Sequence, residues 1–267
     1  MIKTDRSFLS ASAAALAVTL AVAFSPAAQA ASISYGNFGP VAPGVSFLNV
    51  TESSGTDAVP LYGAPSPFAT GLDFDPTSFV AVATNGSADI TDGQMNFTVQ
   101  GQVVNNTAVA VKTISLNEGG DYTLVGTGTA ASQVVAGAIL GVKVVEIDGV
   151  AVAPITLSPV NGSVGFNLAA NPGIVQPWSL GMLIDIEAQL TGLGVSFEVG
   201  ATKAEVVLNN SLVAISEPGT VAFIAKKDFV IGVVPEIGQL TIVPEPATVG
   251  LMGLALCGLG LSARRKS

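Results

Sequence analysis

The chain has 267 residues, with 19 acidic and 10 basic side chains, one cysteine and no histidine, and its formal net charge is −9. Residues 31–243 contain 17 acidic residues, five lysines and no arginine, so this central part carries a charge of −12. The composition excludes histidine-dependent catalysis and histidine-ligated metals, and it argues against nucleic-acid binding, which needs clustered basic side chains. The only cysteine is Cys257, so the central part has no disulfide, thiol nucleophile or thiolate metal site.

Residues 1–30 have the three parts of a secretory signal peptide. Lys3 and Arg6 give a positively charged start, and an apolar stretch follows over residues 8–24. Small residues then mark the expected cleavage site, which leaves a new N-terminus at the last of them: Ala28, Ala30 and Ala31. We expect cleavage by signal peptidase, rather than a retained membrane anchor, and therefore export of the residues that follow.

Residues 31–242 are expected to form one all-β extracellular domain, in which residues 36–77 are loop-rich. This stretch contains six prolines, which remove backbone donors and favour turns. The simplest interpretation is an ordinary irregular connection. The alternative is a segment that covers a sheet edge or faces a partner.

Two acidic clusters are the best candidates for a metal site. Asp73 and Asp75 form the first, and Asp89 and Asp92 form the second. Carboxylates spaced in this way in loops can bind Ca²⁺ together with backbone carbonyls. Neither cluster matches an EF-hand loop, and aspartate also caps turns without any metal. We therefore expect no cofactor and keep calcium as the alternative.

The central part alternates between polar and apolar residues with a period of two, the pattern of strands with one wet face. The alternating segments are residues 94–100, 184–190 and 195–199. More continuous apolar runs, rich in Val and Ile, cover residues 79–83, 134–140, 142–147 and 229–234. Many short strands without a long amphipathic helix predict a β-sandwich or jelly roll.

Turn signals separate several of these runs. Asp148-Gly149, between residues 142–147 and 150–155, predicts a tight β-hairpin. Asn209-Asn210 is predicted to form a turn between two further strands. Other expected turns or breaks are Asn85-Gly86, Gly119-Gly120 and Asn161-Gly162.

Catalytic constellations are weak. Asp185 and Glu187 are two residues apart, so on a strand they would share one face, and a pair of carboxylates is what glycoside hydrolysis requires. Trp178 is the only tryptophan, whereas a sugar cleft usually needs several aromatic platforms. Lys226 and Lys227 are interpreted as an exposed hairpin end rather than as nucleophiles. We expect a protein that is not an enzyme.

The last 25 residues have three parts in a fixed order. Residues 243–246 read Val-Pro-Glu-Pro, residues 247–263 carry no charge, and residues 264–267 are basic. As a transmembrane helix the uncharged part would span about 25 Å, near the lower limit for a bilayer. The basic end should remain cytoplasmic, which places the acidic central part outside.

This tail, over residues 243–267 and together with the signal peptide, resembles the PEP-CTERM sorting signal of Gram-negative bacteria. The resemblance implies an inner-membrane-anchored precursor that an exosortase recognises and processes, followed by transfer to the cell surface or extracellular matrix. The residues of the recognition motif would be Pro244, Glu245 and Pro246. Those of the stop signal would be Arg264, Arg265 and Lys266.

The resemblance also links such tails with exopolysaccharide and biofilm. It implies that the body is a non-catalytic matrix component, with exopolysaccharide as a partner. A Ca-dependent or carbohydrate-binding β-sandwich module is the alternative, and a carboxylate-based glycoside hydrolase is a minor one.

Overall fold

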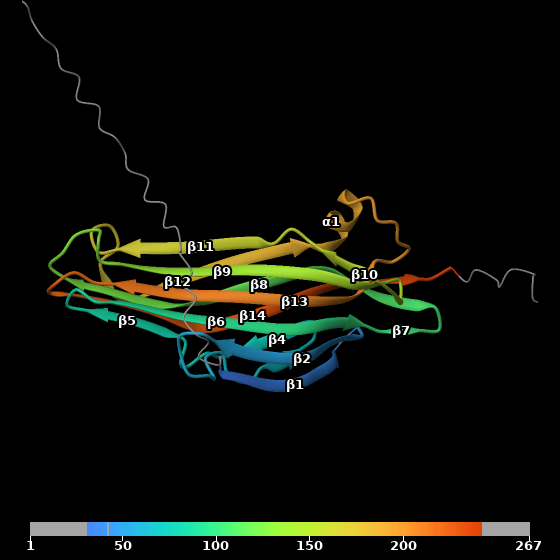
Figure 1. The fold of residues 1–267 in the computed structure, drawn as a ribbon, viewed down its shortest axis with the longest axis horizontal. Coiled ribbons are helices and arrows are strands. Elements are labelled where there is room, and N and C mark those ends of the chain that lie inside the picture. The colour runs from blue at the N-terminus through green and yellow to red at the C-terminus, as the bar shows by residue number, and fades with distance from the viewer. Residues whose placement is uncertain (1–30, 42, 242–267) are drawn as a thin grey trace, which may run out of the picture.

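The computed structural model describes residues 31–41 and 43–241, which form an all-β structure (Figure 1). This part of the chain contains 14 β-strands and one α-helix. The strands form two antiparallel sheets of seven strands each. The prediction of an all-β fold is therefore confirmed.

The first sheet has the order β1-β2-β6-β13-β9-β10, and β11 also pairs with β9. Its strands are β1 (Ala31–Val41), β2 (Val45–Ser54), β6 (Ala88–Gly101), β9 (Gln133–Ile147), β10 (Val150–Thr156), β11 (Val160–Asn167) and β13 (Ala201–Ile215).

The second sheet has the order β12-β8-β14-β4-β3, with β5 also on β14 and β7 on β8. Its strands are β3 (Ser66–Phe68), β4 (Gly71–Phe74), β5 (Val80–Thr84), β7 (Val103–Val104), β8 (Thr107–Gly126), β12 (Gly173–Asp185) and β14 (Thr220–Gln239).

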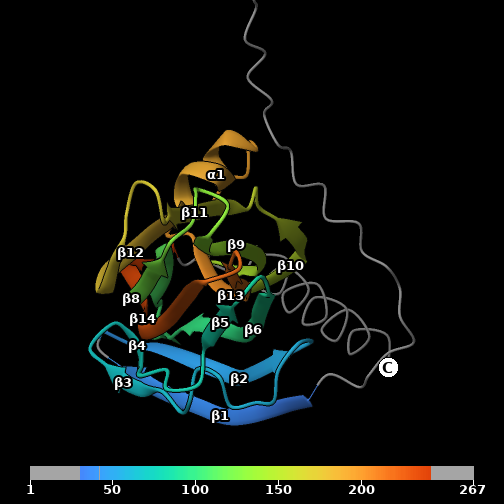
Figure 2. The ribbon, with the colours of Figure 1, turned by 90° about the vertical axis from the view of Figure 1, so that its left-hand side faces the viewer.

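The two sheets pack face to face around a shared core. In the end-on view β8, β12 and β14 lie on one side, and β6, β9 and β13 lie on the other (Figure 2). Phe97 and Leu208 from the first sheet join Leu116 and Ile231 from the second in one buried cluster. Burial of these inward faces drives the sandwich together, because the opposite face of each strand can stay in water.

The alternation at residues 94–100 correctly predicts one face of β6. Met95, Phe97 and Val99 are buried, whereas Gln94 and Asn96 lie on the outer face. The apolar runs at 79–83, 134–147 and 229–234 also fall in or overlap strands.

Two of the predicted turns are confirmed. Asp148 and Gly149 join β9 to β10 with φ values of 51° and 78°. Asn85 and Gly86 join β5 to β6 with φ values of 52° and 88°. Positive φ at both positions matches the right-handed twist of a hairpin, and Asn, Asp and Gly adopt it most easily.

Three other turn predictions are wrong. Asn209-Asn210 lies inside β13, where the strand pairs with β6 and β9 on both sides. Asn161-Gly162 lies inside β11. Gly119-Gly120 lies inside β8, opposite a register shift between Lys226 and Asp228 of β14. Pairing with neighbouring strands overrides the local turn preference at these sites.

The strand predicted at residues 184–190 is also wrong beyond its first two residues. The chain turns into helix α1 (Ile186–Gly192), and the Asp185 carboxylate caps it by accepting a hydrogen bond from the Ala188 amide. Ile186 and Leu190 are four residues apart and share the buried side of this helix. Residues 195–199 are not a strand either, because the amides of Glu198 and Val199 bind the Asp148 carboxylate.

The expectation of a loop-rich segment over residues 36–77 is only partly right. It contains β2, β3, β4 and part of β1, and its longest irregular part is residues 55–65. Strands β1 and β3 lie at the ends of the two sheet orders. Edge strands tolerate proline because one of their sides is unpaired, which is why proline content overstated the loop.

None of the helices in the described ranges is long and apolar enough to span a membrane. The predicted signal peptide at 1–30, with Ala28 and Ala30, lies outside the described residues, as do the predicted helix at 247–263 and the sorting residues around it.

Candidate functional site

The four aspartates predicted as calcium ligands lie in different sheets. Asp73 is on β4 and Asp75 follows it, and both are exposed. Asp89 and Asp92 are on β6, where the Asp89 carboxylate accepts a hydrogen bond of 2.7 Å from the Val82 amide. Over residues 31–41 and 43–241, no group of three or more acidic, His or Cys side chains is placed to hold a metal. Calcium binding stays a prediction.

Asp92 instead holds the start of the irregular segment. Its Oδ1 atom accepts hydrogen bonds from the Ser54 hydroxyl at 3.1 Å, the Gly55 amide at 2.9 Å and the Thr56 amide at 3.2 Å. The Thr56 hydroxyl donates to the same atom at 3.1 Å, and these four donors on one carboxylate oxygen fix the turn that leaves β2.

Buried Glu52 holds the other end of the same segment. Its carboxylate accepts hydrogen bonds from the amides of Leu61 and Tyr62 and, at 2.5 Å, from the Tyr35 hydroxyl. Burial and the adjacent carboxylate raise the pKa of Tyr35, so this phenol remains a donor. Segment 55–65 is thereby docked so that Tyr62 reaches the core.

The carboxylates considered for glycoside hydrolysis do not form a strand pair. Asp185 caps α1, and Glu187 in the first turn forms an ion pair with Lys112 at 2.7 Å. Lys112 also binds Glu236 at 2.9 Å, and these two carboxylates raise its pKa. The geometry that motivated the hydrolase alternative is therefore absent from the described residues.

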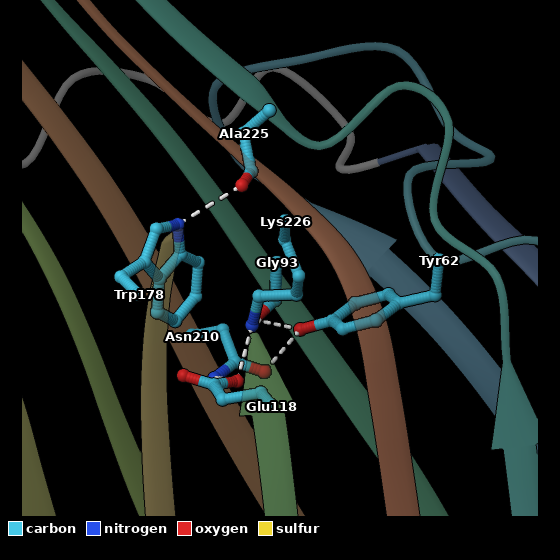
Figure 3. A network of polar contacts seen from close by, with 7 residues as sticks. All are labelled: Tyr62, Gly93, Glu118, Trp178, Asn210, Ala225 and Lys226. Carbon is cyan, nitrogen blue, oxygen red and sulfur yellow. Dashed lines mark hydrogen bonds and ion pairs between the residues drawn. The ribbon is translucent and has the colours of Figure 1, made fainter. Parts of the chain in front are cut away.

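A charged pair lies between the two sheets (Figure 3). Lys226 on β14 forms an ion pair with Glu118 on the adjacent strand β8, and their side chains are 1% and 0% exposed. Isolated charges are strongly disfavoured in such a place, so the pair must be held by further contacts.

Asn210 and Tyr62 complete this cluster, which we call the buried tetrad: Tyr62, Glu118, Asn210 and Lys226. The Nδ2 atom of Asn210, on β13 of the opposite sheet, donates to Glu118 Oε2 at 2.8 Å, and Lys226 Nζ donates to the same oxygen. The Tyr62 hydroxyl lies 2.8 Å from Asn210 Oδ1 and 3.0 Å from the Gly93 carbonyl. Within the described structure, Glu118 Oε1 has no hydrogen-bond partner.

Aromatic rings surround the amine of the tetrad. Lys226 Nζ lies 4.7 Å from the centroid of Phe79, 5.0 Å from that of Phe229 and 5.7 Å from that of Tyr62. Burial lowers the pKa of Lys226, although Glu118 partly opposes this shift. Burial and the nearby carboxylates raise the pKa of Tyr62 well above its usual value, so its hydroxyl keeps its proton.

This tetrad is not among the sites predicted from the sequence. The prediction that Lys226 and Lys227 form an exposed hairpin end is wrong, because both lie inside β14 and only Lys227 of the two points to solvent, where it pairs with Asp121. The sequence does contain a hint, because Ala222, Ile224 and Lys226 are alternate residues of one strand, and alternate side chains point to the same, buried face. Glu118 and Asn210 occupy the inward phase of their own strands in the same way.

Polar residues gather on the outer face of the first sheet in a second place. A hollow of about 650 Å³ lies over β2, β6, β13, β9 and β11. One row crosses all five strands, because direct neighbours pair in the order Ser53, Gln94, Asn209, Ile139 and Asn161. A second row beside it runs through Asp92, Ser211, Gly137 and Ser163.

The solved structures that match this chain at low similarity include a phage tailspike protein and a viral particle protein. Tailspike protein 4 of bacteriophage CBA120 is 14% identical, with a TM-score of 0.20, over 76% of this chain and 19% of that one. The VP2 subviral particle of infectious bursal disease virus is 11% identical, with a TM-score of 0.21, over 80% of this chain and 59% of that one. The chain thus spans less than two thirds of both.

No protein of curated function matches the sequence. The family model of the PEP-CTERM protein-sorting motif matches residues 243–266. This match confirms the resemblance of the tail, and it indicates an exported, membrane-anchored precursor. The chain therefore carries a PEP-CTERM sorting motif and is an exosortase-sorted extracellular protein.

Proposed function

We propose that exosortase processing delivers the β-sandwich to the cell surface or extracellular matrix of a Gram-negative bacterium, where it is a non-catalytic structural component. The match of residues 243–266 to the sorting motif carries this proposal. In this role Pro244, Glu245 and Pro246 form the segment that the exosortase reads. Because proline restricts φ and has no backbone N–H, we propose that the exosortase binds this motif as an extended segment.

The charge of the body supports a place in the matrix. Residues 31–243 carry a charge of −12 and no arginine. Such a charge keeps the domain soluble and repels anionic polysaccharide unless divalent cations bridge the two. Exopolysaccharide is the proposed neighbour, bound through such bridges or through neutral sugars.

The test of sorting is the mass of the mature protein recovered from its host with and without the exosortase gene. We expect loss of about residues 1–30 in both strains and loss of the tail near Pro246 only when exosortase is present. A Glu245→Ala variant should keep its tail in the complete host, whereas Glu236→Ala, outside the motif, should not. Retention of the tail by the native sequence in both strains would refute the proposal.

A second candidate function is carbohydrate binding at the outer hollow. Its two rows present amide and hydroxyl groups from Gln94, Asn161, Asn209, Ser163 and Ser211. These groups donate and accept hydrogen bonds as sugar hydroxyls require. Gly137 leaves space over the outer face of the sheet, and a glycan chain lying across the strands would run along the two rows. The surrounding negative charge favours a neutral glycan.

Binding of soluble neutral glucan and of anionic alginate by the purified protein tests this second function. We expect binding of the glucan that weakens about tenfold in Asn209→Ala, the loss of one to two hydrogen bonds. Thr98→Ala, on the outer face of β6 but outside the hollow, is the matched control and should bind normally. Equal binding by both variants would exclude the hollow, and loss of binding in chelator would point to calcium bridges instead.

A further inference from the structure

We propose that the buried tetrad forms a covalent amide bond between Lys226 Nζ and Asn210 Cγ, which links the two sheets of the sandwich. The reaction is intramolecular and needs neither a cofactor nor another protein. It goes beyond the proposed function and does not depend on it.

The positions of Lys226 and Asn210 favour this reaction. Lys226 lies on β14 of the second sheet, and Asn210 lies on β13 of the first, with their side chains meeting between the sheets (Figure 3). Lys226 Nζ and Asn210 Nδ2 both donate to the same oxygen, Glu118 Oε2. The amine and the carboxamide are therefore held within two hydrogen-bond lengths of each other. Such fixed proximity is worth many orders of magnitude in rate for an intramolecular reaction.

The surroundings of Lys226 favour the neutral amine, which is the nucleophile. An amine attacks a carboxamide only in its neutral form, and a lysine in water is almost entirely charged. Three aromatic rings enclose Lys226 and exclude water, and burial shifts its pKa downward. Transfer of one proton from Lys226 to Glu118 removes both charges from the core and yields the neutral amine.

The hydrogen bonds of the Asn210 side chain favour attack on its carbonyl group. An ionised carboxylate can only accept hydrogen bonds, so Asn210 turns its NH₂ group toward Glu118 and its oxygen toward Tyr62. The Tyr62 hydroxyl, whose pKa is raised, retains its proton and donates to Asn210 Oδ1 at 2.8 Å. A donor at this atom stabilises the negative charge that develops on it during attack.

The reaction replaces one bond of Asn210 with another and releases ammonia. Lys226 Nζ forms a bond to Asn210 Cγ, and the bond from Cγ to Nδ2 breaks. Glu118 accepts two protons from Nζ in turn and gives one to Nδ2, which leaves as ammonia. The product contains a neutral amide and a protonated Glu118, so nothing is oxidised or reduced and no charge remains in the core.

A covalent link between the sheets also suits the composition. The only cysteine, Cys257, lies beyond the described residues, so a disulfide cannot join β13 and β14. Side-chain packing and hydrogen bonds such as that from Asn210 to Glu118 hold the sheets together. An amide bond would not depend on the redox state of the surroundings.

Mass spectrometry of the protein purified from its host tests the proposal. Trypsin should leave residues 204–227 as one peptide, uncut after Lys226 and lighter than its sequence by one ammonia. Chymotrypsin can cut this loop after Leu212 and Phe223. The fragments that carry Asn210 and Lys226 should remain joined after both cuts. Separate fragments of unmodified mass would overturn the proposal.

Variants separate this reaction from ordinary loss of ammonia at asparagine. Glu118→Gln retains a side chain of the same shape but cannot accept the protons, so its fragments should separate at full mass. Lys227→Gln removes the neighbouring exposed lysine and should keep the joined fragments. A loss of ammonia that persists in Lys226→Met would show cyclisation of the Asn210 backbone and would overturn the proposal.

Discussion

Asn209 and Asn210 are neighbours on β13, yet the sandwich gives them opposite surroundings. Asn209 is exposed in the outer hollow, whereas Asn210 is 3% exposed and holds Glu118 and Tyr62. The alternation of side chains along a strand separates the two environments by a single residue. On the outer face, water can form hydrogen bonds with a polar side chain, whereas between the sheets other protein groups must provide them.

A buried and an exposed lysine–glutamate pair differ in the same way. Lys226 and Glu118 are almost completely buried, whereas Lys143 and Glu205 form a 3.1 Å pair with side chains 45% and 49% exposed. Water screens the outer pair, and removal of one partner leaves the other hydrated. Removal of one partner of the inner pair leaves a buried charge alone. The comparison therefore predicts large effects inside the sandwich and small effects outside it.

The largest effect is expected for Glu118→Ala. It leaves Lys226 buried without its carboxylate and should lower the free energy of unfolding by about 3–5 kcal/mol. Glu205→Ala, the matched change in the exposed pair, should cost less than about 1 kcal/mol. Urea unfolding of the two variants and the wild type measures both values. Equal losses would contradict the contrast between the buried and exposed pairs.

The next effect compares two glycines on the inner and outer faces. A Cβ at Gly93 would lie 2.7 Å from Phe79 Cε2 and 2.9 Å from Tyr62 Cε2, so Gly93→Ala should cost about 1–3 kcal/mol by displacing these rings. A Cβ at Gly137 would approach Ser211 Oγ only to 3.4 Å, so Gly137→Ala should change stability by less than about 0.5 kcal/mol. Thermal unfolding should rank them so; the reverse order would refute the placement of Tyr62.

The smallest effect concerns Glu217, which is neither fully buried nor fully exposed. Hydrogen bonds from the Thr129 amide and hydroxyl and from Ser132 lower its pKa below the ordinary value of 4.5. Because the pKa is lower in the folded state than in the unfolded state, the ionised carboxylate stabilises the fold at pH values above the unfolded-state pKa. This stability is lost as the pH falls through the folded-state pKa.

Glu217→Gln should therefore lower the urea midpoint slightly at neutral pH and make less difference at about pH 3. Asp73→Asn, at an exposed carboxylate on β4, is the control. A difference between Glu217→Gln and the wild type that grows on acidification would show that the carboxylate is not stabilised in its charged form.

Much of the fold could be predicted from local patterns. Residues 94–100 form a strand with one wet face, and Asp148-Gly149 needs φ values that few other pairs adopt easily. The segment 184–190 was misleading because its apolar residues satisfy two periods at once. Ile186 and Leu190 fit an alternating strand, but their spacing of four also fits a helix, and the cap at Asp185 decides between them.

The sequence by itself determined the sorting motif at residues 243–266, because the motif is defined by the order of residues that are neighbours in the chain. It also determined the all-β class through alternation along single strands. Only the tertiary structure decided which polar residues meet between the sheets. Tyr62 and Asn210 are 148 residues apart and Glu118 and Lys226 are 108 apart, so their contacts depend on register and sheet packing, which no local pattern encodes.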